Sequence, residues 1–373
     1  MAQGNKVLVV GAGVTGAALS HLLQDAKQAL KYVPDVVVWE KNNIAGGRMM
    51  ARSFRKNRSV HVDIGAQYLT KFTTANDDFR ARLVQKHELV PFDESAIAQD
   101  SYHQARRTDA SDGKPLLDHA ICPDALGFRS MVQELLEGTP TILSQELERF
   151  EVLNDTQIKV VSVDGREEMV NNLVLTCPVP NVLPILDKST AFPARAAELE
   201  ALAAVQYSQR FALAYLFNGE IASQVQKLGW ISKYVSEEED DVVRYLCWDN
   251  LKKQRSTGEN PYFTLLVHTS VPFGVKNMDN KRENDEILAT ITKSVKKILP
   301  FLPDEEDVIM HRWRISQVTK PYREASIPAL VISESPKIVL AGDAFLGSTF
   351  DNCLLSAKAA ANIITKGAIS SGL

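Results

Sequence analysis

The sequence predicts an α/β fold that starts with one βαβ unit, and three observations predict it. Residues 6–10 are a short β-branched run typical of a buried parallel strand, and a glycine-rich turn follows at 11–16. Residues 17–30 are helix formers with an apolar stripe. Residues 35–40 (DVVVWE) are a second apolar run that ends in an acid. Strand, glycine turn, helix and strand in this order make one βαβ unit.

The second half of the chain predicts a separate α+β region with an antiparallel sheet. Strands are expected at 210–217, 242–248 and 262–269, and an amphipathic helix at 285–299. The acidic run 237–241 and the basic run 252–255 between these strands are expected to be solvated. A late buried strand at 337–340 and an alanine-rich terminal helix at 354–365 complete the chain. The polar stretch 101–114 is expected to be a mobile surface loop.

Composition narrows the function classes. The chain has 373 residues, which fits two packed domains or one large α/β domain with an insert. It is 45% hydrophobic and 24% charged, as is usual for a globular protein, and its net charge of −4 does not favour a nucleic-acid binder. No apolar stretch approaches the roughly 18–20 residues of a membrane span. The four cysteines are far apart, so neither a metal site nor a disulfide framework is expected. We therefore expect a cytoplasmic protein without a membrane partner.

The glycine turn has the spacing of a dinucleotide site. Gly11 permits the tight turn, Gly13 lets the backbone approach a pyrophosphate, and Gly16 lets the helix pack on the strand. The helix N-terminus offers N–H groups to phosphates. Glu40 lies 24 residues after Gly16, where a carboxylate can bind an adenosine ribose. A purely structural turn is the alternative. The candidate cofactor residues of this unit are Gly11, Ala12, Gly13, Thr15, Gly16, Glu40 and Lys41.

Three later segments favour FAD over NAD as the nucleotide. Two glycines and an arginine at 46–48 can bring a second loop to the pyrophosphate, and residues 63–68 can line a flavin. An aspartate after the late strand can bind a ribityl hydroxyl, and a helix N-terminus near 348–352 can face the flavin pyrimidine. Helix capping is the alternative for Asp351 and Asn352. The candidates are Gly47, Arg48, Gln67, Tyr68, Gly342, Asp343, Asp351 and Asn352.

These residues resemble the flavin amine oxidase superfamily and, within it, the renalase family. The superfamily pattern is VVGAGVTG, VWEKNNIAGGRM, VDIGAQY and the late AGDA. The features similar to renalases are GAQYLT at 65–70, CPVP at 177–180, YSQRFAL at 207–213, HTSVPFGV at 268–275, WRISQVT at 313–319 and FDNC at 350–353. The likeness runs from about 6 to 364 and is weakest at 71–118.

The resemblance implies a fold, a cofactor and a reaction. The fold is p-hydroxybenzoate-hydroxylase-like, with a discontinuous FAD-binding domain at 1–75, 125–190 and 330–373 and a substrate domain at 76–124 and 191–329. FAD is expected to be non-covalent, with Thr15, Arg48, Gln67 and Tyr68 at family contact positions. Covalent attachment through Cys353 is not expected. The implied substrates are the 2- and 6-dihydro isomers of NAD(P)H, which give NAD(P)⁺ and, after reoxidation by molecular oxygen, hydrogen peroxide.

Three residues are candidates for the substrate cavity. His268 can contact a carboxamide, Trp313 can stack on a ring, and Arg314 can pair with a substrate phosphate. A core histidine, a packing tryptophan and a structural salt bridge are their respective alternatives. Two other functions stay open: a flavin amine oxidase acting on a small amine, and an FAD-binding signalling protein without turnover.

Overall fold

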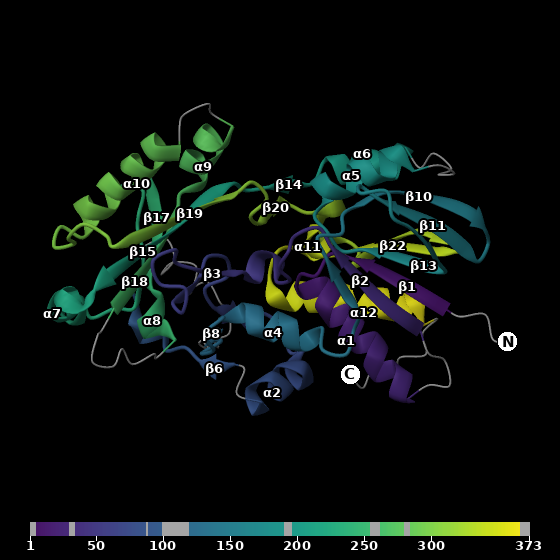
Figure 1. The fold of residues 1–373 in the computed structure, drawn as a ribbon, viewed down its shortest axis with the longest axis horizontal. Helices are drawn as coiled ribbons and strands as arrows, with labels where there is room; N and C mark the ends of the chain where they lie inside the picture. Colours follow the sequence, from purple (N-terminus) through teal and green to yellow (C-terminus); the bar gives the residue numbers. More distant parts are fainter. Residues whose placement is uncertain are drawn as a thin grey trace.

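The computed structural model describes residues 5–29, 34–86, 89–98, 119–189, 196–253, 262–279 and 284–365. The expected loop at 101–114 therefore lies outside the described residues. Figure 1 shows two lobes, each built around one sheet, with the second sheet and its helices at the left. Within the described residues, no helix is both long and apolar enough to cross a membrane.

The first sheet has six strands in the order β21-β22-β13-β1-β2-β9. Their bounds are β1 Asn5–Val10, β2 Pro34–Glu40, β9 Thr141–Leu143, β13 Asn172–Leu175, β21 Ala329–Glu334 and β22 Lys337–Ala341. All neighbours are parallel except the edge strand β21. In β1, Val7 and Val9 belong to one hydrophobic cluster and Leu8 and Val10 to another. Both faces are therefore covered, which explains the continuous apolar run.

Helices cover one face of this sheet and a small antiparallel sheet covers the other (Figure 1). The face of Val7 and Val9 packs against helices α1, α4 and α12, with bounds Val14–Ala29, Phe128–Leu135 and Phe350–Ile364. The face of Leu8 and Val10 packs against β10 to β12 and two helices. These elements are β10 Leu147–Asn154, β11 Gln157–Ser162, β12 Glu167–Val170, α5 Val179–Lys188 and α6 Ala196–Ala203.

The second sheet has the order β19-β15-β18-β17-β16-β7 and is antiparallel except between β16 and β7. Its strands are β7 Ile97–Ala98, β15 Arg210–Asn218, β16 Ser232–Tyr234, β17 Val243–Trp248, β18 Tyr262–Thr269 and β19 Asp307–Trp313. Helices α9 (Val271–Met278) and α10 (Asn284–Ile298) cover its outer face. The opposite face, through Ala212 and Ala214, packs against Val62 and Ile64 of the first lobe.

Short elements connect and flank the two sheets. They are β3 Ala51–Ser53, β4 His61–Asp63, β5 Leu69–Thr70, α2 Asp77–Gln85, β6 Val90–Pro91, β8 His119–Ile121, β14 Gln206–Tyr207, α7 Ala222–Lys227, α8 Asp249–Lys252, β20 Val318–Lys320 and α11 Asp343–Leu346. Single 3₁₀ turns lie at Gly47–Met49, Glu94–Ala96, Gly219–Ile221 and Tyr322–Ala325.

The predicted α/β class with a Rossmann-type unit and an antiparallel sheet is confirmed. The predicted start of the terminal helix, at 354, is wrong. Helix α12 begins at Phe350, four residues before the expected position. Its N-cap is Thr349, whose hydroxyl accepts a hydrogen bond from Asn352 N at 3.1 Å. The capping interpretation of Asp351 and Asn352 is therefore wrong, because both lie inside the first turn. The domain boundaries stay a prediction.

Candidate cofactor and active site

A cavity of about 2140 Å³ is lined by both lobes. The first lobe contributes the carboxyl ends of β1 and β2, and the second contributes residues of β15, β17, β18 and β19. Ligands of open parallel sheets bind at the carboxyl ends of the strands. Typical small-molecule sites hold roughly 300–1,000 Å³, so this cavity has room for more than one ligand.

The glycine turn enters the cavity beside a second glycine loop. A Cβ on Gly16 would lie 2.0 Å from Gly11 O, so only glycine lets α1 pack this closely on β1. A Cβ on Gly47 would lie 3.2 Å from Gly13 Cα, so the backbones of the two loops are in close contact at these two glycines. Gly11, Gly13, Thr15 and Gly47 line the cavity, while Gly16 packs behind it. The bare backbone and the N-terminus of α1 suit a pyrophosphate.

Glu40 lies at the end of β2 and is held by backbone amides. Its Oε2 accepts a hydrogen bond from Ala12 N at 2.9 Å, and its Oε1 accepts from Asn42 N at 2.9 Å. The carboxylate is nearly buried but lines the cavity beside the exposed Lys41. Oε1 also accepts from Asn42 Nδ2 at 2.6 Å, so three of the roughly four acceptor positions of the carboxylate are occupied and about one remains for a ribose hydroxyl.

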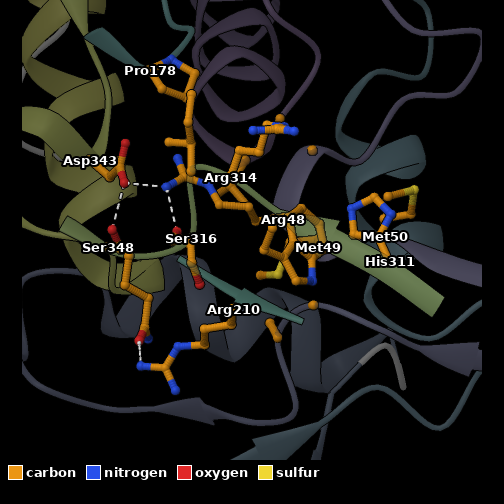
Figure 2. Close-up of a pocket in the computed structure, with 18 of the residues that line it drawn as sticks. Arg48, Met49, Met50, Pro178, Arg210, His311, Arg314, Ser316, Asp343 and Ser348 are labelled. Atoms are coloured by element: carbon orange, nitrogen blue, oxygen red, sulfur yellow. Dashed lines mark hydrogen bonds and ion pairs between the residues drawn. The ribbon is translucent and has the colours of Figure 1, made fainter. Parts of the chain in front are cut away.

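Arg48 joins the second glycine loop to the late strand (Figure 2). Its guanidinium donates to Ser316 O at 2.9 Å and to the Asp343 carboxylate, which also accepts from Ser348 Oγ. Burial disfavours the charged form, yet the adjacent Asp343 carboxylate raises the pKa of Arg48 above its ordinary value. Asp343 therefore lines the cavity with two neighbours already bound to it, and its contact with a flavin stays a prediction.

Gln67 and Tyr68 line the cavity on the loop after β4. Gln67 Nε2 donates to Asp63 O at 2.7 Å, which turns its Oε1 toward Lys252 Nζ at 3.2 Å. Tyr68 shares a hydrogen bond between hydroxyl groups with Tyr234 of the second lobe. Gln67 and Tyr68 thus each contact a residue of the second lobe, Lys252 of α8 and Tyr234 of β16, and their place beside a flavin stays a prediction.

Two lysines of the predicted solvated run 252–255 are buried, which corrects that expectation. The side chains of Lys252 and Lys253 are 0% and 1% exposed. Lys252 Nζ lies 2.9 Å from Asp249 Oδ1 and 3.1 Å from Asp63 Oδ2, and Lys253 Nζ lies 2.8 Å and 3.3 Å from the same two carboxylates. We call these four residues the buried ion cluster. Its only sequence signal is the i+3 and i+4 spacing from Asp249.

His268 and Trp313 line the cavity and meet at one backbone carbonyl. Trp313 Nε1 donates to Ile64 O at 2.9 Å, and His268 Nε2 lies 3.1 Å from the same oxygen. A carbonyl only accepts, so Nε2 carries the proton and Nδ1 is the acceptor of the neutral ring. Burial, reinforced by the charge of Arg210, lowers the pKa of His268 to about 4. The ring is therefore neutral at physiological pH.

Some predicted site residues lie elsewhere. Arg314 lines the cavity, but its side chain is 56% exposed and forms an ion pair with Asp279. Asp351 is fully buried behind the cavity and pairs with Arg80 Nε at 3.0 Å. Asn352 Nδ2 donates to Leu346 O, and Gly342 N donates to Ser356 Oγ. From α12, the residues that line the cavity are Phe350 and Cys353.

Cys353 remains a thiol at neutral pH. Burial, reinforced by the Asp343 carboxylate, raises its pKa to about 12. A protonated thiol is a poor nucleophile, so the site gives no support for a thioether to the cofactor.

Comparisons with known proteins define the class. The model of the family "Flavin containing amine oxidoreductase" matches residues 118–365, more than half of the chain, and that of the "NAD(P)-binding Rossmann-like domain" matches 9–85. The chain belongs to the flavin-containing amine oxidoreductase family, and its cofactor is FAD, bound non-covalently.

Two relatives share almost the whole length. Renalase of Mus musculus is 26% identical over 368 residues, which are 97% of this chain and 99% of the relative. The crystal structure of a protein assigned as a protoporphyrinogen oxidase from Exiguobacterium sp. 255-15 has a TM-score of 0.69 and 14% identity, covering 98% of this chain and 99% of that one. The second likeness concerns the fold alone.

Proposed function

We propose that the protein oxidises the 2- and 6-dihydro isomers of NAD(P)H, giving NAD(P)⁺ and, with molecular oxygen, hydrogen peroxide. The observation that carries this proposal is the cavity, whose 2140 Å³ has room for a dinucleotide beside FAD. The similarity to a renalase over 97% of the chain supports the same substrate class. When bound, FAD supplies the acceptor for the two electrons of the substrate.

The cavity residues suit positioning better than proton transfer. A dihydronicotinamide has no acidic proton that must leave before the hydride, so no general base is required. His268, with a pKa of about 4 and its proton on Nε2, offers Nδ1 as an acceptor for a carboxamide N–H. Trp313, held by Ile64 O, and His311, 4.3 Å from it between ring centroids, form an aromatic wall. Binding in a fixed orientation is then the main contribution of the chain.

Anaerobic stopped-flow absorbance tests the proposal. The purified holoprotein is mixed separately with 6-dihydro-NAD, ordinary β-NADH and a panel of small amines. Bleaching by the dihydro isomer, followed by peroxide formation on adding air, is the expected result. Bleaching by an amine alone makes the protein an amine oxidase, which the family membership also allows. Bleaching by no donor favours a non-catalytic FAD-binding protein.

We also propose a cytoplasmic location. Cys122, Cys177, Cys247 and Cys353 are all free thiols, which a reducing compartment preserves. Cell fractionation with an antibody tests this, and recovery in a secreted fraction contradicts it.

A further inference from the structure

Arg210 is a cavity arginine without a carboxylate partner among the described residues. It begins β15 and lies opposite Trp313 of β19. Its Nη2 donates to Gln317 Oε1 at 3.1 Å on the exposed side of the group. Its Nε is buried and has no hydrogen-bond partner. Figure 2 shows Arg210 among the residues that line the cavity, together with Ser316 and Ser348.

The environment of Arg210 is unfavourable for a cation. Burial is the main cause that lowers its pKa, and the positive charge of Arg244, which also lines the cavity, acts in the same direction. A buried guanidinium is ordinarily balanced by an anion, because desolvation of an unpaired charge is costly. Here Gln317 offers only a neutral oxygen. An anion that enters the cavity would supply the negative charge that the guanidinium lacks among the described residues.

The other cavity arginines that pair with acids cannot take this role. Arg48 is bound to Asp343, and Arg314 to Asp279. The neighbouring loop places five acids on the cavity lining, Glu237, Glu238, Glu239, Asp240 and Asp241, and none of them forms an ion pair with Arg210 in the part of the chain that the structure describes. Glu239 pairs with Lys233, and Asp240 accepts from Val242 N and Val243 N. Helix α9, whose first residues Val271 and Pro272 line the cavity, adds the positive end of its dipole to the same wall.

We propose that Arg210, with Arg244 beside it, is the subsite for the pyrophosphate of the dinucleotide substrate. This inference rests on the proposed function and names the group that holds the non-reacting part of the substrate. The fork of an arginine matches phosphate oxygens in a bidentate geometry. Arg210 is then a binding residue that distinguishes a dinucleotide from a bare dihydronicotinamide.

The test compares substrates with and without phosphate. Steady-state kinetics are measured for 6-dihydro-NAD and for 6-dihydronicotinamide riboside, using the wild type and Arg210→Gln. We expect the variant to raise KM for the dinucleotide about 10- to 100-fold, while kcat for both and KM for the riboside stay within about twofold. Calorimetric binding of NAD⁺ should weaken by the same factor, and binding of nicotinamide riboside should not change.

Two further variants guard against misfolding and general charge effects. Gln317→Glu keeps Arg210 but gives it a carboxylate partner, so it should raise the dinucleotide KM in the same direction. Arg82→Gln removes an arginine of α2 that is 43% exposed and outside the cavity lining, and should change neither substrate.

The outcomes separate the two proposals. If Arg210→Gln raised KM equally for the dinucleotide and the riboside, or lost bound FAD instead, the pyrophosphate subsite would be overturned and the proposed function would stand. A wild type that oxidises neither donor refutes the proposed function itself, before any variant is compared.

Discussion

Replacing Lys252 by methionine tests whether the buried ion cluster holds the two lobes together. Its ammonium contacts Asp249 at 2.9 Å, Asp63 at 3.1 Å and Gln67 at 3.2 Å, with no exposed side-chain surface. Removing one partner of a buried ion pair costs about 3–5 kcal/mol, because an uncompensated charge remains. Lys253 stays 2.8 Å and 3.3 Å from the same carboxylates, so we expect the lower end, about 3 kcal/mol.

Urea denaturation of the holoprotein at pH 7.5 measures this loss as a shift in the free energy of unfolding. The carboxylates raise the pKa of Lys252 above its ordinary value although burial opposes this. Its contribution is therefore complete at neutral pH and is lost only when the pH rises through that raised pKa. In the variant, the deficit should shrink as the pH falls, because burial already raises the pKa of Asp63 and protonation removes the uncompensated charge.

Lys296→Met is the matched control. Lys296 pairs at 2.6 Å with Asp304, whose side chain is 98% exposed, so its loss should cost less than about 1 kcal/mol. If Lys252→Met were also within about 1 kcal/mol of the wild type, the cluster could not be the charged, desolvated contact between Asp63 and α8 that the distances describe.

Three further predictions concern single contacts. Glu40→Ala should weaken FAD binding at least about tenfold in a fluorescence titration, because Ala12 N and Asn42 N lose their charged acceptor; an unchanged Kd contradicts the ribose site. Thr349→Ala should lower the free energy of unfolding by about 1 kcal/mol through loss of the α12 cap, and no shift in the urea midpoint would refute it. Between pH 6.5 and 4 the wild type should lose about 3 kcal/mol more of its free energy of unfolding than His268→Gln. The reason is that the histidine of the unfolded chain binds a proton in this range, whereas the folded ring, with its pKa of about 4, stays mostly neutral. Parallel pH profiles of the two proteins would show that His268 is not buried as a neutral ring.

Local sequence determined the elements that carry their own signal. The run 262–269 is a strand with the predicted bounds. Gly11 and Gly13 lie between β1 and α1 as expected, whereas Gly16 lies inside α1, which begins at Val14 and not at 17. Such features depend on nearest neighbours: β-branched residues, glycines at fixed offsets and a strand-ending acid. A dinucleotide site was therefore predictable from the first 40 residues, and FAD as the nucleotide from the segments 46–48 and 63–68 together with the late AGD segment and 348–352.

Tertiary structure alone decided how charges and polar groups pair. Lys252 and Lys253 look like a solvated basic run in the sequence, yet both are buried. Their shared partner Asp63 lies 189 residues before Lys252 in the chain. Asp351 looks like a site residue, yet Arg80 of α2 binds it behind the cavity. Arg210 lies in the segment YSQRFAL, but an arginine at the start of a strand shows in the sequence neither its burial nor its missing counterion. Burial and pairing between distant segments are set by how the two sheets pack, and no local pattern encodes that distance.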